Sequence, residues 1–213
     1  MVFDCDGLLV DTEARWSVAE AALFARHGFG FGAEQKAMLI GRTVPDAVAE
    51  LTSYFGRPGE DEQLTAELMA LVRQELDAGA EALPGARRIV AECAARVPVA
   101  VASNSPRALV EAALARAGLA ELLPVVVTAD DVVRGKPDPE LYLTACAKLG
   151  AEPGASVAFE DSGTGAAAAR AAGMYLITVP SLPGRAVDHD WLLDTLDDPA
   201  LLGWARTLAP IAR

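Results

Sequence analysis

Lysine is scarce in this chain of 213 residues, which contains only Lys36, Lys136 and Lys148. Acidic residues outnumber basic ones by 30 to 18, which gives a formal net charge of −12, and no cluster of Lys and Arg is present. Because nucleic acids are bound by clustered cations that neutralise phosphates, this charge pattern argues against a nucleic-acid partner. An anionic ligand would therefore need a local positive site.

Cysteine is also rare. The three cysteines, Cys5, Cys93 and Cys146, lie far apart and form no C-x-x-C pair, which argues against a disulfide framework or a structural zinc site. No apolar run approaches the roughly 20 residues that a membrane helix needs. The amino terminus carries Asp4 where a signal peptide would be basic. We therefore expect a cytoplasmic protein with reduced thiols and no membrane segment.

The composition, with 52% apolar and 23% charged residues, is that of a globular chain able to bury a full core. Short β-branched runs alternate with helical segments rich in Ala, Leu and Arg, a pattern typical of a parallel sheet. From residue 181 onward, the chain is expected to form helices that pack on the core. Strands are predicted at residues 1–3, 97–102, 123–128, 156–159 and 175–179.

A long stretch without a convincing strand separates the first two predicted strands. Within it, the spacing of apolar residues predicts helices at 14–27, 45–54 and 61–78, with Thr12 as a possible N-cap of the first. The predicted fold is α/β, with a doubly wound parallel sheet. Its core consists of residues 1–13 and 83–213, and residues 14–82 form a helical cap subdomain inserted after the first strand.

Four polar clusters follow predicted strands, at the edge where doubly wound sheets place their active sites. Taken alone, the first cluster could be a turn, and a serine of the second could cap a helix. The clusters are Asp4 to Asp6, Ser103 to Ser105, Gly135 to Pro137, and Glu160 with Asp161.

Repulsion among the carboxylates is the main argument for a metal. If the strand ends meet, Asp4, Glu160 and Asp161 face a phosphate dianion with only Lys136 to oppose them. Each like-charge pair at about 4 Å would cost on the order of 4 kcal/mol at an effective dielectric near 20. Mg²⁺ binds carboxylates together with substrate phosphate oxygens. The sequence therefore predicts Mg²⁺ as the cofactor.

The four clusters, in this order, closely resemble the motifs of the haloacid dehalogenase-like (HAD) superfamily of phosphohydrolases. The stretch after the first motif is similar to its β-phosphoglucomutase and sugar-phosphate phosphatase branch, which carries a helical cap. The resemblance implies that Asp4 is the nucleophile and forms an aspartyl phosphate. It implies that Asp6 is the general acid and base, and that Ser103 and Lys136 stabilise the transition state.

The same resemblance implies where the metal and the phosphate bind. Mg²⁺ would be held by Asp4, by the backbone carbonyl of Asp6 and by Asp161, with Glu160 nearby or in direct contact. The backbone amides of Cys5 and Asp6 would complete the phosphate cradle. The Cys5 thiol itself is read as a spacer between two aspartates.

Substrate choice is expected to depend on the cap. Glu13, Trp16 and Arg42 are predicted to contact the substrate, together with Asn104 in the core, and Lys36 is a further candidate. Each cap residue could equally be a solvated charge or a packed aromatic ring. The expected partner is a small phosphorylated metabolite, and the chain is expected to be a monomer or a weak dimer.

Three functions are compatible with these motifs. The favoured one is a Mg²⁺-dependent phosphatase that hydrolyses a small phosphomonoester, preferably a sugar phosphate. The alternative is a β-phosphoglucomutase-type phosphosugar mutase, although such mutases resemble one another in a cap histidine and a cap arginine where this chain has Trp16 and Val44. The third is a catalytically idle family member that binds a phosphometabolite. Dehalogenases and phosphonatases are disfavoured because they lack a counterpart of Asp6.

Overall fold

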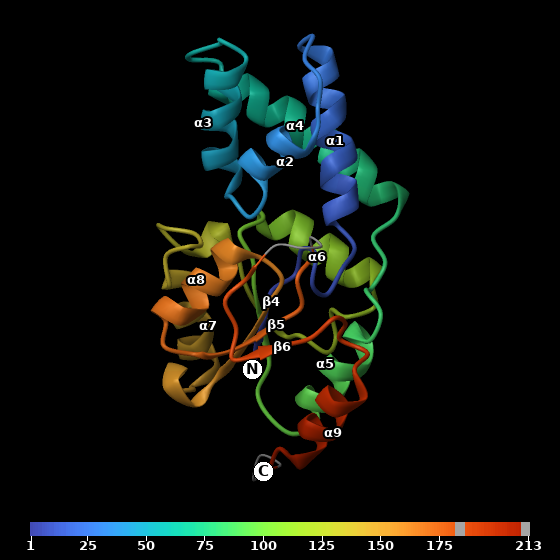
Figure 1. Cartoon of the computed structure of the whole chain (residues 1–213), viewed down its shortest axis with the longest axis vertical. Helices are drawn as coiled ribbons and strands as arrows, with labels where there is room; N and C mark the ends of the chain where they lie inside the picture. Colours follow the sequence, from blue (N-terminus) through green and yellow to red (C-terminus); the bar gives the residue numbers. More distant parts are fainter. Residues whose placement is uncertain (182–185, 210–213) are drawn as a thin grey trace.

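The computed structural model describes residues 1–181 and 186–209, which form an α/β core with a helical cap above it (Figure 1). Within these residues the core sheet has six strands, all parallel, in the order β3-β2-β1-β4-β5-β6. The predicted α/β class with a parallel sheet is confirmed. The strands are β1 (Val2–Phe3), β2 (Ala100–Ala102), β3 (Val125–Val127), β4 (Val157–Glu160), β5 (Tyr175–Thr178) and β6 (Trp191–Leu192).

The carboxyl-terminal part differs from the prediction. All five predicted strands are present, but the sixth strand, β6, lies where only helices were expected, and it pairs with β5 through Trp191 and Ile177. With two residues, β6 is too short to show the alternation that signals a strand. One helix, α9, follows it. Residues 182–185 and 210–213, which the same prediction covered, lie outside the described residues.

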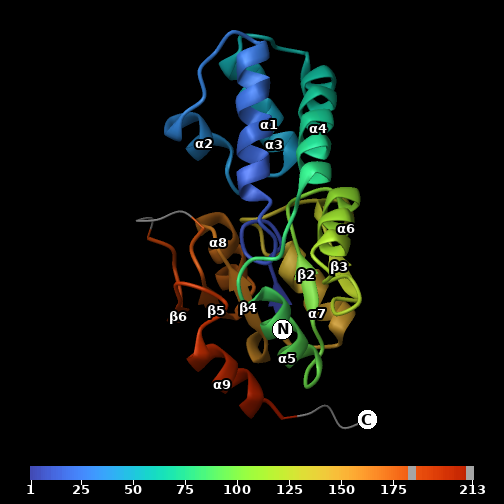
Figure 2. The ribbon, with the colours of Figure 1, turned by 90° about the vertical axis from the view of Figure 1, so that its right-hand side faces the viewer.

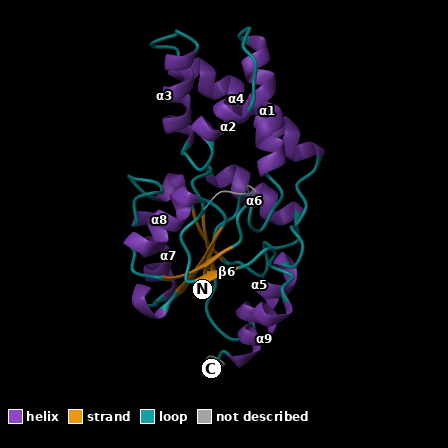
Figure 3. Ribbon diagram, in the orientation of Figure 1, coloured by secondary structure: helices purple, strands orange, loops and turns teal. Residues whose placement is uncertain are grey.

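Helices cover both faces of the sheet, because neighbouring residues of a strand point to opposite sides (Figure 3). Phe3 and Phe159 belong to the apolar cluster that includes α5, α6 and α9. The residues before them, Val2 and Ala158, pack with α7 and α8 in a second cluster. The helices are α5 (Ala86–Ala94), α6 (Arg107–Arg116), α7 (Glu140–Leu149), α8 (Gly163–Ala171) and α9 (Pro199–Thr207).

The cap is a helical insertion after β1, as predicted, and it consists of four helices where three were expected. In it, α1 and α4 lie side by side (Figure 2). The short helix α2 was not predicted, since of its seven residues only Leu39 is buried and no apolar stripe marks it. The boundaries at 13/14 and 82/83 stay a prediction. The cap helices are α1 (Glu13–Arg26), α2 (Ala33–Leu39), α3 (Val44–Tyr54) and α4 (Asp61–Ala78).

Two linkers join cap and core and run antiparallel to each other. The amide of Asp11 donates to the Glu81 carbonyl at 2.9 Å, and the amide of Leu83 donates to the Leu9 carbonyl at 3.0 Å. The cap is thus connected to the core by a short paired segment next to the end of β1. Among the described helices, none combines the length and the apolar character that crossing a membrane requires.

The aromatic pair at the centre of the sheet is expected to carry a large part of the core's stability. Phe159 is fully buried and stacks on Phe3, with 4.5 Å between ring centroids. Phe159→Ala should lower the free energy of unfolding by about 3–5 kcal/mol, because it removes the ring and leaves a cavity. Urea denaturation measures this loss. Leu143→Ala, at a position that is 42% exposed, is the control, and equal losses in both variants would contradict the prediction.

Candidate active site

The predicted strand ends meet above the centre of the sheet. β1 lies between β2 and β4, and the chain runs outward from β1 in both directions, so the loops after these three strands surround a topological switch point. An open cavity lies there, about 740 Å³ when the space open to solvent is included, lined by residues of the core and of the cap. The active site expected from the motifs therefore coincides with a cavity between the core and the cap.

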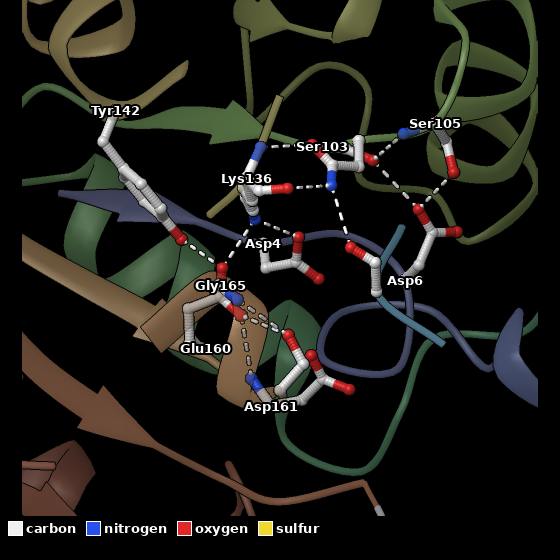
Figure 4. Close-up of polar contacts among 12 residues, drawn as sticks. Asp4, Asp6, Ser103, Ser105, Lys136, Tyr142, Glu160, Asp161 and Gly165 are labelled. Atoms are coloured by element: carbon white, nitrogen blue, oxygen red, sulfur yellow. Dashed lines mark hydrogen bonds and ion pairs between the residues drawn. The ribbon is translucent and has the colours of Figure 1, made fainter. Parts of the chain in front are cut away.

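Lys136 joins two carboxylates at the floor of this cavity (Figure 4). Its Nζ donates to Asp4 Oδ1 at 2.6 Å and to Glu160 Oε1 at 2.5 Å. Asn104 fixes the backbone of the same lysine, since its Oδ1 accepts from the Lys136 amide at 2.8 Å and its Nδ2 donates to the Lys136 carbonyl at 3.1 Å. The lysine is thus held at both ends and is 5% exposed.

Glu160 is fully buried and accepts hydrogen bonds at both carboxylate oxygens. Besides Lys136, the Tyr142 hydroxyl donates to Oε1 at 2.5 Å, and the Ser162 hydroxyl donates to Oε2 at 3.3 Å. A Cβ at Gly165 would lie 2.0 Å from this carboxylate, so only glycine fits there. Sequence analysis missed Tyr142 and Gly165. Gly165 belongs to a Gly-Thr-Gly run close to the acidic pair, and this run could have indicated close packing at the site. Tyr142 lies within α7, where no sequence pattern marks it as a site residue.

Electrostatics at the floor are unfavourable for ionised carboxylates in the bare protein. Burial, reinforced by the charges of Glu160 and Asp6, raises the pKa of Asp4 to about 8 against the opposing effect of Lys136. Burial and the neighbouring carboxylates also raise the pKa of Asp161 well above its usual range. Burial lowers the pKa of Lys136, but Asp4 and Glu160 outweigh it and raise that pKa, so the lysine stays charged.

Three of these residues could hold a metal ion. One carboxylate oxygen from each of Asp4, Glu160 and Asp161 lies within 4.8 Å of the other two, the only such group in residues 1–181 and 186–209. Carboxylate oxygens suit a hard divalent cation, which would also relieve their repulsion. Gly7, with a φ of +82°, makes room for the group, because a Cβ there would lie 2.5 Å from Asp161 Oδ2. The side chain of Asp6 is not part of it.

Asp6 instead accepts hydrogen bonds from three hydroxyls, and Figure 4 shows the two from Ser103 and Ser105. Thr12 donates to its Oδ1 at 2.6 Å, and Ser103 and Ser105 donate to its Oδ2 at 2.9 and 2.8 Å. Thr12 is the N-cap residue of α1, as predicted, but its hydroxyl makes no capping bond to the helix and donates to Asp6 instead. Neither serine caps α6 either, because that helix begins after Pro106 without a side-chain cap.

The structure brings most of the predicted substrate-contacting residues to the cavity. Glu13, Trp16, Arg42 and Asn104 all line it, and Cys5 does not. The side-chain amide of Asn104 is fully engaged within the protein. It bonds to the Lys136 backbone, and its Nδ2 also donates to the carbonyl of Gly41 in the cap at 2.9 Å. Asn104 therefore ties cap to core. Burial raises the pKa of the Cys5 thiol, in keeping with a spacer.

The structure defines an α/β protein with an inserted helical cap and a carboxylate-rich cavity between cap and core. Residues 1–173 match the family model of haloacid dehalogenase-like hydrolases, and the chain belongs to this family. The resemblance found in the sequence is thereby confirmed, and the protein is a hydrolase.

Several known proteins similar to this chain are phosphatases. Validoxylamine A 7'-phosphate phosphatase of Streptomyces hygroscopicus subsp. limoneus is 38% identical over 190 residues, 89% of this chain and 86% of that protein. Fructose-1-phosphate phosphatase of Escherichia coli is 33% identical over 84% of this chain and 95% of its own length. The crystal structure of CbbY from Rhodobacter sphaeroides in complex with phosphate has a TM-score of 0.81 and 27% identity, and covers 95% of this chain and 97% of that one.

The raised pKa of Asp4 predicts a pH-dependent cost in stability. An acid whose pKa rises on folding, here from 3.8 to about 8, costs stability progressively as the pH increases from the unfolded to the folded value. In metal-free protein, the stability of Asp4→Asn relative to wild type should therefore increase by roughly 4 kcal/mol between pH 5 and pH 9, since about three pKa units lie between pH 5 and the folded value. Urea denaturation at both pH values measures this. A difference between variant and wild type that stays constant or shrinks from pH 5 to pH 9 would contradict the prediction.

Proposed function

We propose that the protein is a Mg²⁺-dependent phosphatase that hydrolyses a small phosphomonoester, preferably a sugar phosphate, through an aspartyl-phosphate intermediate. One observation carries the proposal: the Lys136 ammonium holds Asp4 by Oδ1 at the floor of the cavity, 2.6 Å away. The names of several relatives support the substrate class, among them fructose-1-phosphate phosphatase and hexitol phosphatase B of Escherichia coli.

Asp4 has the position that a nucleophile needs. Its Oδ1 is fixed by Lys136, which leaves Oδ2 to attack phosphorus in line. A bond forms between this oxygen and phosphorus while the bond to the ester oxygen breaks. Lys136 stays protonated throughout and stabilises the charge on the transferring group. Water then attacks the phosphorus of the intermediate and releases phosphate and free Asp4.

Asp6 is proposed to move the protons in both steps. In the first it gives a proton to the departing alcohol oxygen, and in the second it takes a proton from the attacking water. The three hydroxyls of Thr12, Ser103 and Ser105 hold its carboxylate at the rim of the same cavity. Because Thr12 directly precedes α1, the orientation of the acid depends on where the cap begins.

Asp4, Glu160 and Asp161 form a donor set that fits Mg²⁺ and would hold it. The backbone carbonyl of Asp6 would add a further ligand, as the family resemblance implies. When bound, the ion neutralises negative charge on the phosphoryl group. The buried carboxylates themselves repel one another without a cation, as the raised pKa values of Asp4 and Asp161 indicate.

A phosphosugar mutase is the second candidate. The fold favours neither function, since the solved structures that resemble this chain include CbbY and β-phosphoglucomutases. Against the mutase stand Trp16 and Val44, which line the cavity at the places where the family's mutases resemble one another in a histidine and an arginine. Release of free phosphate without a bisphosphate activator would decide for the phosphatase.

Replacement of the proposed nucleophile tests the function. Asp4→Asn should reduce phosphate release from p-nitrophenyl phosphate by at least about 10³-fold, since an amide cannot form the intermediate, while circular dichroism stays unchanged. Asp11→Asn is the matched control, because Asp11 lies in the same loop and is exposed. Turnover retained in the Asp4 variant would refute the proposal.

Metal removal tests the cofactor. Dialysis against EDTA should abolish phosphate release, and added Mg²⁺ should restore it, because the three carboxylates and a phosphate dianion are opposed only by Lys136. A colorimetric phosphate assay follows both steps. Full activity in EDTA-treated protein, with metal content verified by elemental analysis, would contradict the Mg²⁺ assignment.

A further inference from the structure

Three ionisable residues meet at the cap side of the cavity, where the proposed chemistry has no use for them. Lys36 of α2 lies between two glutamates of α1, with its Nζ 2.5 Å from Glu13 Oε1 and 2.9 Å from Glu20 Oε2. All three line the cavity. We call this set the Glu13–Lys36–Glu20 cluster. Its members come from separate helices, so the cap fold brings them together.

The two glutamates retain unused capacity to accept hydrogen bonds. Glu13 Oε1 is buried, and its one polar contact in the described part of the chain is the ion pair with Lys36 Nζ, 2.5 Å away. Glu20 is 5% exposed, and its hydrogen bond from Lys36 uses Oε2 alone. A carboxylate offers about four acceptor positions, and Lys36 contacts only one oxygen of each glutamate. A ligand that brings hydrogen-bond donors could use the remaining positions.

The cluster offers no free positive charge. Besides Lys36, the cavity is lined by two other cations, Lys136 and Arg42, and each is paired with a carboxylate. Arg42 lies 3.2 Å from Glu50, and its Nε donates to the carbonyl of Met38. Lys136 serves the phosphoryl group, and Lys36 is neutralised by two glutamates. This leaves only Arg42, 41% exposed and already paired with Glu50, to meet a second phosphate. A second anionic group on the ligand would meet two glutamates around one lysine.

The apolar wall around the Glu13–Lys36–Glu20 cluster strengthens hydrogen bonds that a ligand makes to it. Apolar side chains form much of the remaining wall, and a low local dielectric strengthens bonds to a carboxylate once water is excluded. Neutral hydroxyls are donors that a carboxylate can bind without any change of net charge. The apolar lining residues of the cap are Trp16, Leu39, Ile40, Val44, Ala47 and Leu68.

We infer that the Glu13–Lys36–Glu20 cluster is the subsite for the hydroxyl groups of the substrate, and that it selects a polyhydroxylated monophosphate over a bisphosphate. This inference rests on the proposed phosphatase function. The cluster binds the end of the substrate remote from phosphorus, while Lys136 and Asp4 act on the phosphoryl group. The glutamates accept from substrate hydroxyls, and Lys36 orients both carboxylates.

The test compares kcat/KM for sorbitol 6-phosphate, fructose 1,6-bisphosphate and p-nitrophenyl phosphate. Wild-type protein should favour sorbitol 6-phosphate over the bisphosphate by about tenfold or more. Glu20→Gln should lower the ratio of kcat/KM for sorbitol 6-phosphate to that for p-nitrophenyl phosphate about tenfold, because a bond to a charged acceptor is lost. The same variant leaves Lys36 less neutralised, so the bisphosphate should gain relative to the monophosphate.

Glu34→Gln, an exposed position on α2, is the matched control and should leave all three values unchanged. If Glu20→Gln fails to fold by circular dichroism, Glu13→Gln tests the same ratio with the same expectation. An unchanged ratio in a folded variant, or a wild type that prefers the bisphosphate, would overturn the inference while phosphatase activity stands. Wild-type protein that releases no phosphate from p-nitrophenyl phosphate would instead overturn the proposed function.

Discussion

The contact of the Lys136 ammonium with Asp4 and Glu160 is the interaction on which the rest of the site depends. This contact holds one positive charge among buried carboxylates. Asn104 supports it by fixing the backbone of Lys136, and the Tyr142 hydroxyl supports it by donating a hydrogen bond to Glu160. A lysine buried without such partners would lose its proton. The same partners keep it charged, where it can act on a phosphoryl group.

This arrangement concentrates carboxylates at the floor of the cavity, where their negative charges repel one another in the metal-free protein. The pKa of Asp4 rises to about 8 because burial and its neighbours disfavour the charged form. Sites built for reaction often carry such a cost in stability. Here the cost prepares the floor for a cation and for the one anionic group of a substrate. The cap opposite has its own cation, Lys36, neutralised by Glu13 and Glu20, so the two ends of the cavity differ in what they attract.

Sequence reasoning located the strand-end residues because a parallel sheet brings the carboxyl ends of its strands to one edge. Asp4, Lys136 and the acidic pair at 160 and 161 follow from that rule and from the scarcity of lysine. It failed where a contact joins distant elements without a local pattern, as between Tyr142 and Glu160 or between Lys36 and Glu20. It placed Thr12 correctly at the start of α1, but capping preference cannot show that the Asp6 carboxylate, and not the helix, accepts its hydroxyl.

The central claim is that Asp4 itself carries the phosphoryl group during turnover. Reduction of acid-quenched, substrate-treated protein with borohydride converts an aspartyl phosphate into homoserine, which peptide mass spectrometry locates. The account predicts homoserine at position 4, formed only with substrate present. Phosphate release without homoserine at position 4, or with the modification at another acidic residue, would contradict it.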